Sequence, residues 1–153
     1  MYLRTIYIGS DHAGFKLKKH LSQWLSKQGY DIRDMGPHVY DADDDYPDYA
    51  VRVCDSVIKH RSKGILICGS GQGMDRVANK VPGIHASVCW NEGTALVAKK
   101  HANVNVLCLG ERFVRPSMAR KIAKIWLEEP FEEEKRHVRR IRKINEVEKR
   151  YSS

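Results

Sequence analysis

The residue with the clearest chemical potential is Cys68, which ends an apolar run at 65–68 and precedes a glycine-rich turn. Three glycines follow within five residues, at 69, 71 and 73. Such a turn before a helix presents backbone N–H groups and the positive end of a helix dipole, and both favour a thiolate. The alternative is a buried structural cysteine before an ordinary turn. The other three cysteines, at 54, 89 and 108, are expected to fill the core.

The loop 69–74, GSGQGM, does not match the common phosphate-binding signatures. It lacks G-x-x-x-x-G-K-[ST], and Met74 stands where G-x-G-x-x-G needs its last glycine. A cysteine phosphatase of the C-x5-R type needs arginine at 74, and the nearest one is Arg76. The loop is therefore expected to bind a small anion rather than a nucleotide.

Two arginines near the carboxyl end could bind a phosphate. Arg136 and Arg140 are four residues apart, so a helix would project both from one face. The alternative is a solvated basic face. His12 and His101 lie beside a glycine-rich turn or at the end of a predicted helix, where each could be structural or catalytic.

Short β-branched runs alternate with amphipathic stretches, which is typical of βαβ units that build a parallel sheet. Strands are predicted at about 4–9, 30–34, 64–68, 84–89 and 104–109. Helices are predicted at about 14–28, 47–60, 73–80, 91–101 and 116–128. The fold class is therefore α/β, a Rossmann-like three-layer α/β/α sandwich in one domain, 1–153. Ligands of such sheets bind beyond the carboxyl ends of the strands.

An extra helix is predicted at about 132–150, after Pro130 breaks the chain. Its apolar positions, Val138, Ile141, Ile144 and Val147, form a stripe. The stripe could pack on the sheet of its own chain, but for a terminal helix this long and basic, packing on a partner subunit is expected. The loop 36–46, rich in aspartate, is the one long irregular segment expected inside the domain and is a candidate functional loop.

The charge of +8 and pI of about 9.4 raise the possibility of nucleic-acid binding. Eight of the lysines and arginines lie between 135 and 150, so the excess fits one terminal helix better than a nucleic-acid surface, and no nucleic acid is expected as a partner. No apolar stretch is long enough to span a membrane, and no signal segment is recognised at the start. With four unpaired cysteines, a cytoplasmic location is expected.

Six segments together resemble the type B ribose-5-phosphate isomerase family. They are 9–14 (GSDHAG), 45–50 (DYPDYA), 64–71 (GILICGSG), 78–84 (ANKVPGI), 105–112 (NVLCLGER) and 136–141 (RHVRRI). The resemblance covers nearly the whole chain and is far more specific than any one motif. It implies the isomerisation of ribose 5-phosphate and ribulose 5-phosphate without a metal or other cofactor.

The resemblance also implies roles for matching residues. Cys68 is expected to move a proton between C2 and C1 through an enediolate, and His101 to open the furanose ring. Ser70 is a candidate proton shuttle between the substrate oxygens, while loop amides stabilise the enediolate. The residues expected to contact the sugar phosphate are Asp11, His12, Gly69, Ser70, Gly71, Gln72, Gly73, Ala102, Arg112, Arg136 and Arg140.

Three positions depart from the family pattern. Ala102 stands where an asparagine usually follows the catalytic histidine, and Gln72 and Asp75 replace an apolar and a small hydroxyl residue. These changes keep open an isomerase of a six-carbon sugar, allose 6-phosphate or galactose 6-phosphate. A non-catalytic phosphosugar-binding or nucleic-acid-binding protein is the alternative from a different class.

A homodimer or dimer of dimers with shared active sites is expected. The helix at 91–101 would return His101 to the amino end of the sheet, whereas Cys68 ends its strand at the carboxyl end. A strand of five or six residues separates these edges by roughly 17–20 Å. One subunit could not bring both residues to one substrate.

Overall fold

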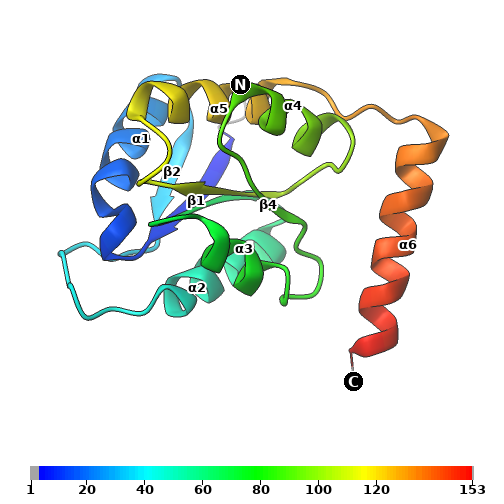
Figure 1. Ribbon diagram of the computed structural model, residues 1–153, viewed down its shortest axis with the longest axis horizontal. Helices are drawn as coiled ribbons and strands as arrows, with labels where there is room; N and C mark the ends of the chain where they lie inside the picture. The colour runs from blue at the N-terminus through cyan, green and yellow to red at the C-terminus, as the bar shows by residue number, and fades with distance from the viewer. Residues whose placement is uncertain (1–3, 153) are drawn as a thin grey trace.

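The computed structural model describes residues 4–152 and shows five parallel strands flanked by helices (Figure 1). The strands are β1 (Thr5–Ser10), β2 (Asp31–Asp34), β3 (Lys63–Cys68), β4 (Ala86–Val88) and β5 (Val106–Gly110). They pair in the order β2-β1-β3-β5-β4. The chain therefore forms one edge at β2, crosses back to β3, forms the other edge at β4 and returns to place β5 between β3 and β4. The predicted α/β fold class is confirmed. Within the described residues, no helix is long and apolar enough to cross a membrane.

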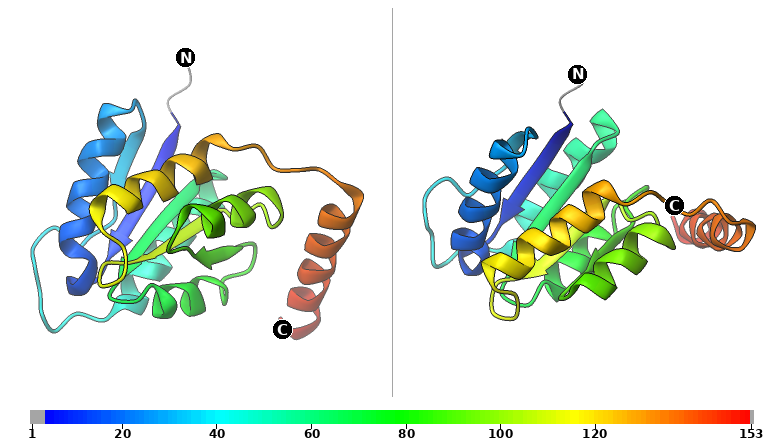
Figure 2. Two further views of the ribbon diagram at one scale, coloured as in Figure 1. Left: turned by 45° about the horizontal axis from the view of Figure 1, so that its top comes forward. Right: turned by 90° about the horizontal axis from the view of Figure 1, so that it is seen from above.

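Helices cover both faces of this sheet because the central strands are apolar on both sides. On one face lie α1 (Phe15–Lys27), α4 (Glu92–Lys100) and α5 (Pro116–Glu128), whose apolar residues pack with Ile8, Ile67 and Leu109. On the other lie α2 (Tyr46–His60) and α3 (Gln72–Ala78), packed against Leu66 and Cys108. The sandwich is visible in Figure 2.

The last helix, α6 (Lys135–Tyr151), stands apart from the sandwich (Figures 1 and 2). The prediction that it begins at about 132 is wrong by three residues. Residues 132–134 run extended, and the Glu132 amide donates a 3.0 Å hydrogen bond to the Lys100 carbonyl at the end of α4. Val138, Ile144 and Val147 remain about half exposed, so most of the apolar stripe has no partner within this chain.

Smaller shifts occur elsewhere. The strand expected at 84–89 shortens to Ala86–Val88, and a 3-10 helix, η1 (His12–Gly14), precedes α1. Asp11 explains the second difference, because its carboxylate accepts a hydrogen bond from the Gly14 amide at 3.1 Å and caps that turn.

Candidate active site

Cys68 is the last residue of β3, and its thiol is held by the turn that follows. The Gly71 amide donates a hydrogen bond to Cys68 Sγ at 3.2 Å, and Cys68 is only 4% exposed. Gly71 has φ +79°, and a Cβ there would lie 2.7 Å from Val88 Cγ2. Glycine is therefore required for the turn that aims this amide at the sulfur.

Within residues 4–152, no backbone amide donates a hydrogen bond to the sulfur of the other three cysteines, and all three are fully buried. Burial raises the pKa of Cys54 to about 12 and that of Cys89 to about 11, and it also raises the pKa of Cys108. These three remain protonated thiols near neutral pH. Their expected role as core residues agrees with their complete burial.

Arg112 follows β5 and lies directly against the loop after Cys68. Its amide donates to the Gly69 carbonyl at 3.1 Å, and a Cβ on Gly69 would lie 2.9 Å from the guanidinium carbon. The preceding residue, Glu111, accepts a 2.6 Å hydrogen bond from the Leu17 amide in the first turn of α1. Glu111 thus ties the loop after β5 to the segment that carries Asp11 and His12.

His12 and Asp44 form a close pair at the same edge of the sheet. Asp44 Oδ1 lies 2.7 Å from His12 Nδ1 and also accepts the His12 amide at 3.1 Å. The hydrogen bond to Asp44 is the main reason why the pKa of His12 is raised, and the nearby Arg112 charge lowers it. The imidazole is therefore protonated over a wider pH range, which suits an anionic ligand.

Asp11 is buried beside this pair, with 6% of its surface exposed. Burial raises the pKa of its carboxyl group, while the Gly14 amide opposes that change. Its own amide donates to the Ile67 carbonyl at 3.3 Å, which holds the turn against the end of β3.

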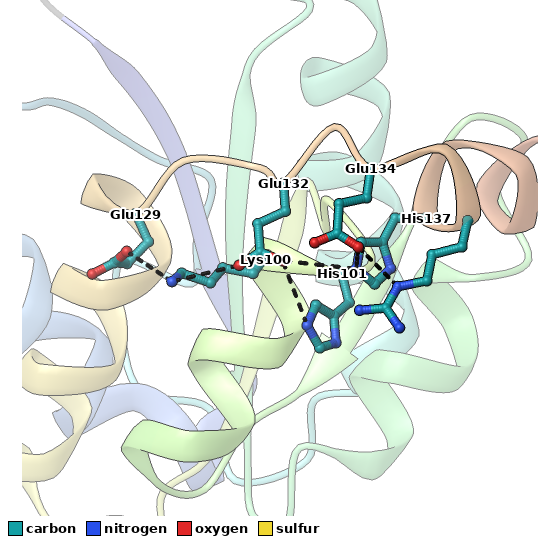
Figure 3. Close-up of polar contacts among 7 residues, drawn as sticks. Lys100, His101, Glu129, Glu132, Glu134 and His137 are labelled. Atoms are coloured by element: carbon teal, nitrogen blue, oxygen red, sulfur yellow. Dashed lines mark hydrogen bonds and ion pairs between the residues drawn. The ribbon is translucent and has the colours of Figure 1, made fainter.

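His101 and Ala102 lie at the opposite edge of the sheet. Ala102 lines a hollow together with Thr5 and Lys63, the first residues of β1 and β3. His101 caps the carboxyl end of α4, and its ring stacks on that of His137, as Figure 3 shows, with centroids 4.4 Å apart. Glu132 Oε2 lies 3.9 Å from His101 Nε2 and 3.8 Å from His137 Nε2.

Arg136 and Arg140 extend this second group along α6. Both are exposed, and Arg136 Nε donates to Glu134 Oε2 at 2.9 Å. The structure therefore divides the predicted site residues between two edges. Asp11, His12, residues 68–73 and Arg112 gather at the carboxyl edge, whereas His101 and Ala102 lie at the amino edge and both arginines lie on the adjoining α6.

Two residues at the carboxyl edge were missed as individual candidates. Tyr46 opens α2, and a Cβ on Gly73 would lie 2.6 Å from its ring carbon Cζ, so the phenol covers the start of α3. Asp44 is the partner of His12. Signals for both existed, because Tyr46 lies in the DYPDYA segment and Asp44 in the long acidic loop.

Asp75, by contrast, faces away from the expected anion. Its Oδ2 accepts the Val88 amide at 3.1 Å, and its Oδ1 accepts Asn79 Nδ2 at 2.5 Å. The Asp75 carboxylate therefore connects α3 to β4 through these hydrogen bonds. Gln72 is exposed, and its backbone amide donates to Ser70 Oγ at 3.3 Å.

Two groups of side chains in the described part of the chain could hold a metal ion by their spacing. One is Asp11, His12 and Asp44, and the other is His101, Glu132 and His137, with ligand atoms in each group within 4.8 Å of one another. The Asp44 oxygen that faces His12 already accepts two hydrogen bonds. The prediction that the reaction needs no metal stays a prediction.

Comparison with known proteins identifies the family. Residues 6–144 match the family described as Ribose/Galactose Isomerase. The chain belongs to this family. It is 48% identical over 147 residues to a Mycoplasma genitalium protein named "Probable ribose-5-phosphate isomerase B", covering 95% of this chain and 96% of that protein.

Solved structures of family members agree with the fold. Ribose-5-phosphate isomerase B of Clostridium thermocellum is 43% identical, with a TM-score of 0.93 over 97% of this chain and 99% of that one. The Mycoplasma genitalium enzyme, solved with bound ribulose-5-phosphate, is 46% identical with the same TM-score and coverage. The family resemblance predicted from the sequence is confirmed.

Proposed function

We propose that this protein interconverts D-ribose 5-phosphate and D-ribulose 5-phosphate. The observation that carries the proposal is the setting of Cys68, a thiol at the carboxyl end of a central strand that receives the Gly71 amide. A relative that is 46% identical has been solved with ribulose-5-phosphate, which supports a five-carbon substrate.

In the proposed mechanism, Cys68 takes the proton from C2 of the open-chain aldose and returns it to C1. A thiolate is too weak a base for this carbon acid unless the negative charge of the enediolate is stabilised as it develops. Amides of the loop 69–73 are the candidate donors, and one such donor lowers the activation barrier by about 3 kcal/mol. Ser70 moves the second proton between the two oxygens.

Ring opening and phosphate binding need the groups at the amino edge of the sheet and on α6, and a partner subunit would supply them. We propose a homodimer, or a dimer of such dimers, in which His101, Arg136 and Arg140 of one subunit meet Cys68, His12 and Arg112 of the other. The largely exposed apolar stripe of α6 supports this arrangement, because most of its side chains lack a partner among residues 4–152. A cytoplasmic location fits the four free cysteines.

The test is an assay of the purified protein for ketose formation from ribose 5-phosphate, allose 6-phosphate and galactose 6-phosphate, with and without a chelator. We expect the highest kcat/KM with ribose 5-phosphate and no loss with the chelator. Preference for a six-carbon substrate would identify a related isomerase. Absence of turnover with all three would contradict the proposal.

A further inference from the structure

One side chain beside His101 has a buried nitrogen without a hydrogen-bond partner. His137 lies in the first turn of α6 and is 3% exposed. Among residues 4–152, no group forms a hydrogen bond with its Nε2. A buried polar atom in this state destabilises the fold unless a partner is supplied. A ligand that binds this nitrogen would supply that partner.

Glu132 Oε2 lies beside this nitrogen and also beside Nε2 of His101. It is 3.8 Å from His137 Nε2 and 3.9 Å from His101 Nε2 (Figure 3). Both distances are too long for a hydrogen bond. They are close to what one metal ion needs, because zinc–nitrogen bonds of about 2.0–2.1 Å at tetrahedral angles place two ligand atoms roughly 3.3 Å apart. A contraction of about half an ångström would therefore bring the three atoms onto one ion.

The other carboxylate oxygens nearby already have partners. Glu132 Oε1 faces the Lys100 ammonium at 3.7 Å, which leaves Oε2 for the two histidines. Glu134 Oε2 lies 3.9 Å from His137 Nε2, but it accepts a 2.9 Å hydrogen bond from Arg136. The available ligands are therefore two imidazole nitrogens and one carboxylate oxygen. Zinc and similar divalent ions bind such a set, with water in the fourth position.

The backbone holds all three ligands in place within one subunit. The Glu132 amide donates a 3.0 Å hydrogen bond to the Lys100 carbonyl, which fixes the segment before α6 against the end of α4. The His137 amide donates to the Glu134 carbonyl at 3.0 Å, which closes the turn that begins α6. The ligands are thus brought together before an ion arrives.

The stacked rings must adjust when an ion binds. The planes of His101 and His137 are 12° from parallel, so the lone pairs of their nitrogens do not meet at one point. The His101 side chain is 45% exposed, and its ring can turn without displacing the core. Metal binding is therefore expected to separate the stack, which gives the site a spectroscopic signature.

The second group with metal-ligand spacing, Asp11, His12 and Asp44, is a poorer candidate. Asp44 Oδ1 and His12 Nδ1 are 2.7 Å apart and already form a hydrogen bond. An ion would have to break that bond, whereas the group around Glu132 Oε2 has none to break between its ligand atoms.

We propose that His101, Glu132 and His137 bind a divalent transition-metal ion such as Zn²⁺, and that the bound ion inhibits the enzyme. An imidazole that ligates an ion through Nε2 carries no proton on that nitrogen, and its ring is held in place. His101 then cannot protonate the ring oxygen of the sugar. The inhibition rests on the proposed ring-opening role of His101, whereas the binding does not.

Calorimetric titration of the assembled protein with ZnCl₂ tests the binding. The Cys68→Ala chain is used, so that this thiol does not compete as a zinc ligand. We expect one ion per chain with a micromolar Kd. His137→Phe keeps an aromatic ring in the stack but removes the ligand, and it should raise Kd at least tenfold, since loss of an outer-shell partner alone costs 10–100-fold.

Two further variants connect the affinity to the proposed ligands. Glu132→Gln should also raise Kd at least tenfold, and it keeps the test valid if His137→Phe fails to fold. Glu133→Gln is the matched control, because Glu133 is an exposed neighbour of Glu132. It should bind Zn²⁺ as the parent chain does.

NMR spectra of the histidine rings identify the ligands directly. Zn²⁺ should shift the ring resonances of His101 and His137 together, because both bind the ion and their stack separates. His20, whose Nε2 lies 2.7 Å from Arg120 Nη1, should be unaffected. A shift at His12 without one at His101 and His137 would place the ion in the other group and overturn the proposal.

Turnover of ribose 5-phosphate tests the inhibition in the chain that keeps Cys68. Zn²⁺ should remove most of the activity, and excess EDTA should restore it. Each variant is compared with its own metal-free rate. His137→Phe and Glu132→Gln should need at least tenfold more Zn²⁺ for half inhibition, whereas Glu133→Gln should need the same amount.

The outcomes separate the metal site from the proposed function. An unchanged Kd in both His137→Phe and Glu132→Gln would overturn the site. Equal inhibition of all variants would assign the effect to another ligand, such as the Cys68 thiol, and overturn the inhibitory role. Binding at His101 without inhibition would contradict both that role and ring opening by His101. Absence of turnover without metal would contradict the isomerase proposal, while the calorimetry and NMR would still decide the metal site.

Discussion

The imidazole rings of His101 and His137 stack with their centroids 4.4 Å apart and their planes 12° from parallel. His137 is buried in α6, whereas the side chain of His101 at the end of α4 is 45% exposed. The contact joins the end of α4 to the beginning of α6, and near the other end of α6 the Glu148 carboxylate accepts the Gly83 amide at 3.2 Å. A molecule that docks beside His101 therefore also approaches the arginines of α6.

The first prediction concerns the proposed base. Cys68→Ala should reduce kcat by about 10³-fold or more, because no other group replaces the base at C2, and should change KM little. Steady-state kinetics with ribose 5-phosphate measures both constants. Cys89→Ala is the matched control, since its buried thiol has a raised pKa, and it should keep most of the activity. Wild-type turnover in Cys68→Ala would refute the assignment.

The second prediction concerns the pH dependence of substrate binding. The hydrogen bond from Asp44 raises the pKa of His12, so Asp44→Asn should lower that pKa. At pH 7.5 less His12 is then charged and KM should rise severalfold, whereas at pH 5.5 His12 is protonated in both proteins and KM should differ little. An NMR titration of the His12 ring measures the pKa directly.

Asp43→Asn provides the control for this experiment, because Asp43 is an exposed neighbour in the same loop. It should leave both the titration and KM unchanged. If Asp44→Asn raises KM equally at both pH values, Asp44 contributes to binding by shaping the loop rather than through the charge of His12.

The order of the elements could be predicted from the sequence because apolar runs and amphipathic stretches report burial directly. The start of α6 could not, since the extension at 132–134 depends on a hydrogen bond from Glu132 to Lys100, more than thirty residues away in sequence. For the same reason, the sequence did not show which of the four neighbouring aspartates in this loop pairs with His12; the structure shows that it is Asp44. Only the folded loop shows which carboxylate reaches His12.

The third prediction distinguishes phosphate recognition from nucleic-acid binding by α6. Arg140→Ala should raise KM about 30-fold, as expected for the loss of a charge-assisted hydrogen bond contributing about 2 kcal/mol. Arg142→Ala is the control on the same helix, because Arg142 lies 3.7 Å from Glu146 and should affect KM little. Salt-sensitive binding of DNA or RNA that ribose 5-phosphate cannot displace would favour the alternative function.

The fourth prediction concerns Ala102. Restoring asparagine should increase kcat more than it changes KM, because the side-chain amide adds a donor to the developing oxyanion. Ala102 is partly buried against the core beside α4, so the new amide must turn outward, and a small loss of thermal stability is expected. An unchanged or lower kcat in Ala102→Asn would mean that the intermediate is placed differently from the expected geometry.

The last prediction is that each active site is shared between subunits. Cys68 pairs with Gly110 at the carboxyl end of β5, while Val106, at the amino end of that strand, follows closely after His101. The five-residue strand spans roughly 17 Å, too far for one sugar phosphate to contact a base and an acid at both ends. A two-fold dimer resolves the problem by placing the His101 edge of one subunit against the Cys68 edge of the other.

The test refolds inactive Cys68→Ala and His101→Asn chains together after joint unfolding. About half of the dimers should be mixed, and each mixed dimer contains one site with both residues intact, so about a quarter of all sites should regain activity. Each variant refolded alone is the control and should remain inactive. Mixed dimers, verified by distinct mass tags on the two chains, that form yet stay inactive would show that Cys68 and His101 serve the same subunit's site. A movement within one subunit would then have to bring the two edges of its sheet together. The continuous hydrogen bonds between β5 and β3 oppose such a movement.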